Sequence, residues 1–226
     1  MSGQQLELLK ERLAQGFLSL GLTLSEQQQK QLLDYLILIA KWNKVYNLTA
    51  IRDPEEMLTH HLLDSLAVIA PLQKHLRDRG VEHGRVLDVG SGAGLPGVVI
   101  AVCCPDVWVC CVDAVGKKAS FISQAATELG LKNLQAIHTR VEALAPTLVQ
   151  EGFDLITSRA FASLGDFVTL TKPHLKCGTG VWMAMKAKDA EHEVMALPSD
   201  AGVFHVERLS VPFLNEERRL VWLRLH

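Results

Sequence analysis

The stretch from Arg85 to Gly97 constrains this chain more than any other part of it. A short apolar run leads to Asp88, glycines follow at positions 90, 92, 94 and 97, and a helix-like apolar run begins at Val98. Glycine allows turns with positive φ and places no Cβ in the way of a ligand. The following helix directs its free N–H groups and the positive end of its dipole at the turn. The pattern predicts the first βα turn of a nucleotide-type cofactor site.

The chain after this turn alternates between strand-like and helix-like segments. We expect strands at 85–89, 107–112, 134–138, 153–158 and 180–185, and helices at 96–103, 117–130, 142–151 and 164–175. Such alternation is typical of a parallel sheet covered by helices, with ligands at the carboxyl ends of the strands. The strand-like runs 203–211 and 218–225 have no helical segment between them, which predicts an antiparallel hairpin at one edge of the sheet.

The N-terminal part has a different organisation. Helical spacing of apolar residues predicts helices at 6–20, 26–42 and 53–71. The charged, glycine-terminated segment 72–84 is expected to be a linker. At 226 residues the chain suits one good core with an extension. We therefore divide it into an N-terminal helical extension with substrate motifs, residues 1–80, and a cofactor-binding domain, residues 81–226.

Composition limits the partners and the compartment. The formal net charge of −2 gives no general case for nucleic-acid binding, so such a ligand requires a confined basic patch. The cations available for it are Lys41, Lys44, Arg52, Lys117, Lys118, Lys186 and Lys188.

The five cysteines (103, 104, 110, 111 and 177) include adjacent pairs in apolar runs and no Cys-x-x-Cys, which suits small buried side chains in a reducing cytosol. No apolar run is long enough for a membrane helix. We expect a cytoplasmic protein without a metal site or membrane contact.

Two polar segments of the N-terminal part are candidates for chemistry. Trp42–Thr49 is either a helix end with a capping loop, in which Asn47 or Thr49 bonds the backbone, or a surface where aromatics stack and amides bind a base. His61 and Asp64 are three residues apart beside an apolar helix face, so we expect them side by side, as structural hydrogen-bonding groups or acting jointly. A metal site is disfavoured because no further ligands stand at suitable spacing.

The glycine turn is compatible with two cofactors. The segment Gly92–Gly97 satisfies G-x-G-x-x-G, and Asp113, about 20 residues on, is placed as a ribose-binding acid, so an NAD-dependent oxidoreductase is one candidate. Three features favour S-adenosylmethionine. Asp88 stands where a cationic ligand's amino group would be held, the glycine loop begins earlier, at Gly90, and the sheet ends in a hairpin without a helix.

Five motifs together resemble those of the rRNA small subunit methyltransferase G family, also called glucose-inhibited division protein B. They are Trp42-Asn43-x3-Asn47-Leu48-Thr49, His61-x2-Asp64-Ser65-Leu66, Leu87 to Gly97, Gly116-Lys117-Lys118 with Phe121 following, and Thr157-Ser158-Arg159-Ala160. The resemblance covers nearly the whole chain, and the first two motifs lie outside the generic cofactor domain, which makes the combination specific. Ala114 departs from the family, which often has serine there, and so lacks the hydroxyl for a ribose or loop hydrogen bond.

This resemblance implies a Rossmann-like class I S-adenosylmethionine-dependent methyltransferase, with a seven-stranded, mostly parallel α/β sheet and an antiparallel edge hairpin. It implies transfer of a methyl group from S-adenosylmethionine to N7 of one guanine in 16S rRNA, within the bacterial small ribosomal subunit or a precursor. We expect the protein to be a monomer.

The resemblance also places cofactor contacts. Carried over by position, they fall on Gly90, Leu95, Val141, Glu142 and Arg159. Asp113 suits the ribose hydroxyls as a bidentate acceptor, and Asp88, Gly92 and Gly94 complete the expected site. From the residues alone, Glu142 is first of all a helix-start acid.

Methylation of guanine N7 needs little acid–base chemistry, because N7 carries a lone pair in the neutral base and no proton must leave. Alignment of nucleophile, methyl and sulfur is then the main contribution, worth up to roughly 7–11 kcal/mol in ideal cases. We expect Asp64 to stabilise the positive charge that develops or to hold the guanine edge, with Asn47 as an orienting amide.

Arg159 and Lys186, at the ends of the fourth and fifth strands, are candidates for binding phosphate or guanine O6. A purely structural ion pair is the alternative for Arg159. An oxidoreductase, a small-molecule methyltransferase and a non-catalytic ribosome- or RNA-binding module remain alternative functions.

Overall fold

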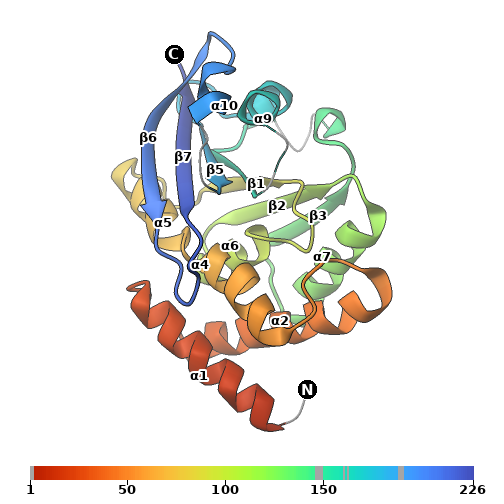
Figure 1. Ribbon diagram of the computed structural model, residues 1–226. Coiled ribbons are helices and arrows are strands. Elements are labelled where there is room, and N and C mark those ends of the chain that lie inside the picture. The colour runs from red at the N-terminus through yellow and green to blue at the C-terminus, as the bar shows by residue number, and fades with distance from the viewer. Residues whose placement is uncertain (1–2, 146–149, 160, 162, 188–190) are drawn as a thin grey trace.

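The computed structural model describes residues 3–145, 150–159, 161, 163–187 and 191–226. Its centre is a seven-stranded sheet with the strand order β3-β2-β1-β4-β5-β7-β6 (Figure 1). The strands are β1 (Arg85–Val89), β2 (Trp108–Asp113), β3 (Leu134–His138), β4 (Leu155–Arg159), β5 (Val181–Lys186), β6 (Ala201–Leu209) and β7 (Arg218–Leu225). The first five pair in parallel, and β7 runs antiparallel to both β5 and β6. The expected sheet and its edge hairpin are confirmed.

Side chains of each strand alternate between two hydrophobic cores. In β4, Leu155 belongs to the core beneath the N-terminal helices, and Ile156 belongs to the core on the opposite face. Their register partners in β5, Val181 and Trp182, continue the same two cores. Because both faces are covered, the buried residues of β5, from Val181 to Met185, are all apolar.

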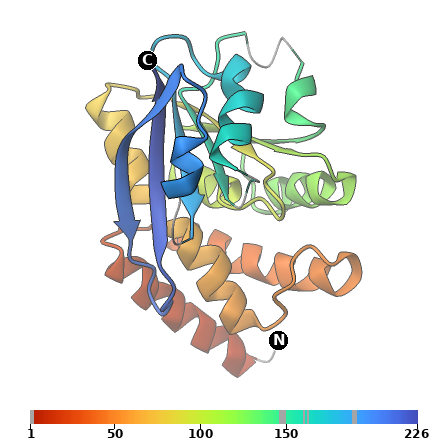
Figure 2. The same cartoon turned by 45° about the horizontal axis from the view of Figure 1, so that its top comes forward.

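Helices cover both faces of the sheet, as Figure 2 shows with the N-terminal helices on one side and α9 on the other. The first face is covered by α2 (Glu26–Tyr46), α4 (Asp64–Leu66), α5 (Ile69–Asp78), α6 (Gly97–Cys103) and α7 (Gly116–Glu128), with α1 (Gly3–Ser19) packed on α2. The second face is covered by α9 (Leu164–Thr171), against which α10 (Glu191–Met195) packs. One core thus joins the N-terminal helices to the sheet, and a domain boundary near residue 80 stays a prediction.

Segment 72–84 is not the linker that its charges and glycine predict. Residues up to Asp78 belong to α5, and Leu72 and Leu76 are buried in the core. Pro71 lies in the first turn of this helix, where a backbone N–H has no intrahelical acceptor, so the proline does not end it. The charged residues occupy the outer face of an amphipathic helix.

Other helices differ from the expectation near their ends. α2 continues to Tyr46, and the helix expected over 53–71 is divided into α3 (Pro54–Met57), a π-helical turn (Leu58–Leu63) and α4. Of the helix expected over 142–151, the structure describes a 3₁₀ turn, Val141–Ala143, after which Leu144 is already extended (ψ 133°). Residues 146–149 of that expected helix, and Lys188 of the expected basic patch, lie outside the described residues.

The cysteine expectation is confirmed for four of the five residues. Cys103, Cys104, Cys110 and Cys111 are buried and free, and burial raises the pKa of the Cys104 thiol to about 11. Cys177 departs from it because its side chain is exposed. Among the described residues, no helix combines the length and the apolar character that crossing a membrane requires.

Candidate functional site

The glycine loop between β1 and α6 has the backbone geometry that its composition predicts. Gly90, Gly92 and Gly94 have φ values of 66°, 61° and 88°, a region that side chains disfavour. The N–H groups of Gly90 and Ser91 both donate to the carbonyl of Val112 at the end of β2. The hydroxyl of Tyr35 on α2 donates to the carbonyl of Ala93, so an N-terminal helix also holds the loop.

Asp88 lies beneath this loop rather than on its surface. The residue is fully buried, and its Oδ2 accepts the N–H of Gly97 at 2.9 Å. Burial is the main cause that raises the pKa of Asp88 to about 7. Its Oδ1 has no hydrogen-bond partner among the described residues. Asp88 therefore binds the backbone at the start of α6. Its contact with a cofactor stays a prediction.

Asp113 is fixed at the end of β2 by two backbone donors. Its Oδ2 accepts the N–H of Gly92 at 2.8 Å, and its Oδ1 accepts the N–H of Val115 at 2.8 Å. A carboxylate has about four acceptor sites, so these bonds orient the group without using its capacity for two hydroxyls.

A cavity of about 200 Å³ lies at the carboxyl ends of β1 and β2 and joins four of the expected cofactor residues, Gly90, Asp113, Val141 and Glu142. Ligand pockets usually begin at about 300 Å³, so this cavity is smaller than a pocket that encloses a whole cofactor. A larger groove of about 660 Å³ lies between α1 and α2. Of the two, the smaller one lies at the strand ends and includes Asp113.

Sequence reasoning missed other residues that line this cavity, among them Thr139, Arg140 and Phe161. A Cβ on Gly90 would lie 3.5 Å from the Phe161 ring, so this aromatic closes the cavity over the loop. The signal in the sequence is position alone, since Phe161 follows the carboxyl end of β4. Leu95 and Arg159 are not among the lining residues.

His174 supports the wall formed by Val141 and Glu142. Its Nε2–H donates to the carbonyl of Val141 at 2.8 Å, which assigns the proton to Nε2 because a carbonyl only accepts. Burial lowers the pKa of His174, so the imidazole is neutral near pH 7. Glu142 also begins the 3₁₀ turn, in keeping with its interpretation as a helix-start acid.

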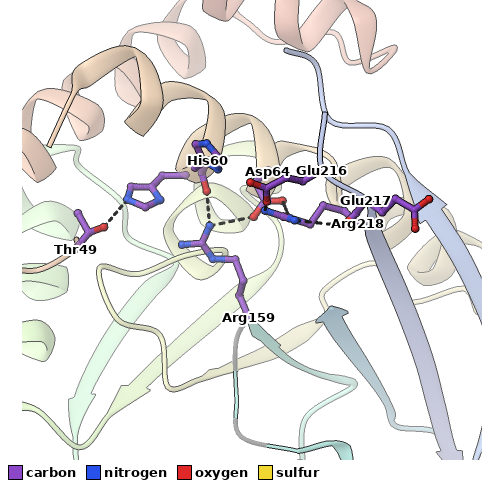
Figure 3. Close-up of polar contacts among 8 residues, drawn as sticks. Thr49, His60, Asp64, Arg159, Glu216, Glu217 and Arg218 are labelled. Carbon is purple, nitrogen blue, oxygen red and sulfur yellow. Dashed lines mark hydrogen bonds and ion pairs between the residues drawn. The ribbon is translucent and has the colours of Figure 1, made fainter. Parts of the chain in front are cut away.

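A second group of polar residues surrounds Asp64 (Figure 3). This buried carboxylate accepts Nη1–H of Arg159 on Oδ2 and Nε–H of Arg218 on Oδ1, each at 3.1 Å. Nη1 of Arg159 also donates to the carbonyl of His60 at 2.6 Å. Two guanidinium groups thus compensate one buried charge.

Arg218 was not expected from the sequence. It is the first residue of β7, and because β7 is antiparallel, its first residues lie at the edge where the parallel strands end. Arg159 forms an ion pair with a carboxylate, as its structural interpretation predicts. Its contact with substrate or cofactor stays a prediction.

His61 and Asp64 each make structural hydrogen bonds, which is one of the two interpretations that their spacing left open, and they share no hydrogen-bond partner. His61 Nε2 lies 2.9 Å from Thr49 Oγ1, whereas Asp64 bonds the two arginines. His61 lies in the π-helical turn of residues 58–63, and Asp64 is the first residue after it. Burial, followed by the charge of Arg159, lowers the pKa of His61 to about 4.

The other two expected catalytic residues lie apart from Asp64. Asn47 is exposed at the end of α2 with φ 49°, and its Oδ1 accepts Nη2–H of Arg52 at 3.4 Å. Lys186 donates to Glu193 of α10 at 2.7 Å. It follows Met185, the register partner of Arg159, so strand alternation directs it to the opposite face of the sheet. The structure does not bring Lys186 to Arg159.

Comparisons with known proteins agree on one family. The family model for rRNA small subunit methyltransferase G matches residues 28–221. The ribosomal RNA small subunit methyltransferase G of Acidovorax sp. (strain JS42) is 57% identical over 217 residues, covering 94% of this chain and 93% of that protein. Its counterpart from Polaromonas naphthalenivorans (strain CJ2) is also 57% identical over 217 residues, covering 96% of each.

Solved structures show the same fold at low identity. A SAM dependent methyltransferase from Aquifex aeolicus superposes with a TM-score of 0.53 at 17% identity, covering 77% of this chain and 99% of that one. TrmN from Thermus thermophilus gives a TM-score of 0.54 at 18% identity, with 75% and 53% covered. The chain has the class I S-adenosylmethionine-dependent methyltransferase fold.

Proposed function

The chain belongs to the rRNA small subunit methyltransferase G family, and on that premise we propose that it transfers a methyl group from S-adenosylmethionine to N7 of one guanine in 16S rRNA. The identity of 57% over 94% of the chain carries this proposal, because substrate motifs outside the cofactor domain are included. The substrate is 16S rRNA in the small ribosomal subunit or a precursor. We place the protein in the bacterial cytoplasm as a monomer.

The residues around the cavity fit S-adenosylmethionine. Asp113 would accept the ribose hydroxyls, Val141 and Glu142 would face adenine, and Gly90 leaves room for the chain beyond the ribose. Leu95, with Gly92 and Gly94, would shape the loop, and Asp88 would hold that loop from below. When bound, the cofactor supplies a methyl group on a positively charged sulfur.

On the side of the base, the protein's task is to position guanine. N7 attacks with its own lone pair, so no residue has to remove a proton. Asp64 holds the guanidinium of Arg159 at the end of β4, and this group is proposed to meet guanine O6 or a neighbouring phosphate. Because Arg159 and Arg218 already compensate the charge of Asp64, this carboxylate acts by orienting Arg159, and Asn47 serves as an orienting amide.

Lys186 is proposed to bind phosphate from the other face of the sheet end. A salt bridge with Glu193 holds it there, at 2.7 Å, and Glu193 also accepts the N–H of Leu164 at the start of α9. An electrostatic contact with the backbone of RNA needs no contact with the target base.

An oxidoreductase is less well supported than a methyltransferase. The antiparallel β7, inserted between β5 and β6, differs from the six parallel strands of a dinucleotide-binding domain. A non-catalytic RNA-binding module would leave the cavity at Asp113 without a role.

The test incubates the protein with methyl-labelled S-adenosylmethionine and small subunits from cells that lack this modification. Nuclease digestion and mass spectrometry then locate the label. We expect one 7-methylguanine in 16S rRNA, and a parallel reaction with deproteinised 16S rRNA tells whether the assembled subunit is required. Label absent from guanine overturns the proposal. Light scattering measures the molar mass in solution, for which we expect the value of a monomer.

A further inference from the structure

Three aromatic rings lead from the core to the surface beside the end of α2. Phe121 of α7 is fully buried, and its ring meets Trp42 edge-on, with centroids 5.4 Å apart and planes inclined by 65°. Trp42 in turn contacts Tyr46, with centroids 4.9 Å apart and planes inclined by 34°. Tyr46 remains 43% exposed. The outermost ring is therefore packed against Trp42 and partly exposed to solvent.

The charge around this ring is positive, unlike that of the chain as a whole. Segment 41–52 contains Lys41, Lys44 and Arg52 and no acidic residue, whereas the whole chain has a net charge of −2. All three cations are exposed, and so is the amide of Asn47 next to Tyr46. The next residue, Asp53, is acidic and exposed, so Lys41 and Lys44 are the cations of this segment farthest in sequence from an acidic residue on that side. Exposed cations attract phosphate groups, which is the basis of sequence-independent RNA binding.

The loop after Tyr46 is tied to the polar group around Asp64. Asn43 Oδ1 accepts the N–H of Thr49 at 2.9 Å, and Asn43 Nδ2 donates to the carbonyl of Ile51 at 2.9 Å. Thr49 Oγ1 contacts His61 in the turn that leads to Asp64. The aromatic surface and the proposed guanine site thus have a fixed relative position.

We propose that the open face of Tyr46 stacks on an unpaired base of the substrate RNA, beside the guanine that is methylated, while the cations of segment 41–52 bind its phosphates. The inference rests on the proposed function, because it takes an RNA substrate as given. Every nucleobase has a π-face, so one fixed ring holds a neighbouring nucleotide of any sequence. Packing against Trp42 does not by itself require the Tyr46 ring to remain 43% exposed.

The experiment compares Y46L and Y46F with the wild type in binding to deproteinised 16S rRNA. Leucine keeps the apolar bulk without the π-face, and phenylalanine keeps the ring without the hydroxyl. We expect Y46L to bind this RNA roughly 5- to 100-fold more weakly, as stacking on one aromatic side chain predicts, and Y46F to bind like the wild type. The affinity for S-adenosylmethionine should not change in either variant.

Phe204→Leu is the matched control, because Phe204 on β6 is 42% exposed, nearly the same as Tyr46, and lies on the strand at the far edge of the sheet. Its RNA affinity should equal that of the wild type. Equal binding of Y46L and wild type to deproteinised RNA overturns the proposal, and so does a wild type that does not bind it. A loss seen only with intact subunits also overturns it, because it indicates a contact with ribosomal protein. Label transfer by the wild type is scored separately, so failure of the proposed function is recognised independently.

Discussion

Asp64 of α4 and Arg159 of β4 are joined by an ion pair of 3.1 Å although 95 residues of chain separate them. One residue comes from an N-terminal motif and the other from the end of a sheet strand. The pair holds the N-terminal helices against the edge of the sheet where the cofactor loop lies. Four predictions concern residues at or near this edge of the sheet.

Replacing Asp64 by asparagine should lower both stability and activity. The amide has the same shape but leaves Arg159 without its carboxylate partner and Arg218 with Glu216 alone, and each arginine is still partly solvated. We expect a loss of about 1–3 kcal/mol in the free energy of unfolding, measured with urea, and at least a tenfold slower single turnover. The control D34N breaks the exposed pair of Asp34 with Lys30 and should change stability by less than about 0.5 kcal/mol. Wild-type turnover in D64N would contradict the proposed role.

Arg159→Ala should slow methyl transfer while the fold persists. Arg218 remains as a partner for the Asp64 carboxylate, so the buried charge is not abandoned. We expect a single-turnover rate reduced by about tenfold or more, with an unchanged circular dichroism spectrum. R159K keeps the charge but not the planar fork and should recover only part of the rate. A rate equal to that of the wild type would show that Arg159 has a structural role and none in methyl transfer.

His174→Ala should weaken the affinity for S-adenosylmethionine. The change removes the donor to the Val141 carbonyl and leaves that wall of the cavity without support. One hydrogen bond is worth about 1 kcal/mol, so we expect the dissociation constant of the cofactor, measured by calorimetry, to rise about fivefold or more. H174Q, which carries an N–H donor, should recover part of the affinity. RNA affinity should stay constant, and a loss confined to RNA would disprove this role.

Asp88 should make stability depend on pH. Its pKa is raised to about 7 in the folded protein from the usual 3.8, so its contribution to stability is complete below about pH 4 and declines as pH rises toward 7. The free energy of unfolding of the neutral isostere D88N, relative to that of the wild type, should therefore rise between pH 4 and 8. The rise is up to about 4 kcal/mol, at 1.36 kcal/mol per unit of pKa shift. Urea unfolding across this range measures the difference, and parallel curves for the two proteins would refute the shift.

Local patterns were sufficient for much of the architecture. The alternation of apolar segments predicted the sheet and its terminal hairpin, because strand and helix periods depend on neighbouring residues. Glycine content predicted the positive φ at Gly90, Gly92 and Gly94 for the same reason. Segment 72–84 was misjudged because its surface charges concealed Leu72 and Leu76, which α5 buries.

The sequence by itself determined the cofactor turn, the order of the strands along the chain and the family, all of which depend on local composition and motif spacing. Tertiary structure alone decided which side chains meet. The antiparallel direction of β7 brings Arg218 to Asp64, strand alternation places Lys186 on the other face from Arg159, and His61 bonds Thr49. The first two outcomes depend on strand direction and register, which are set by packing between segments far apart in the chain.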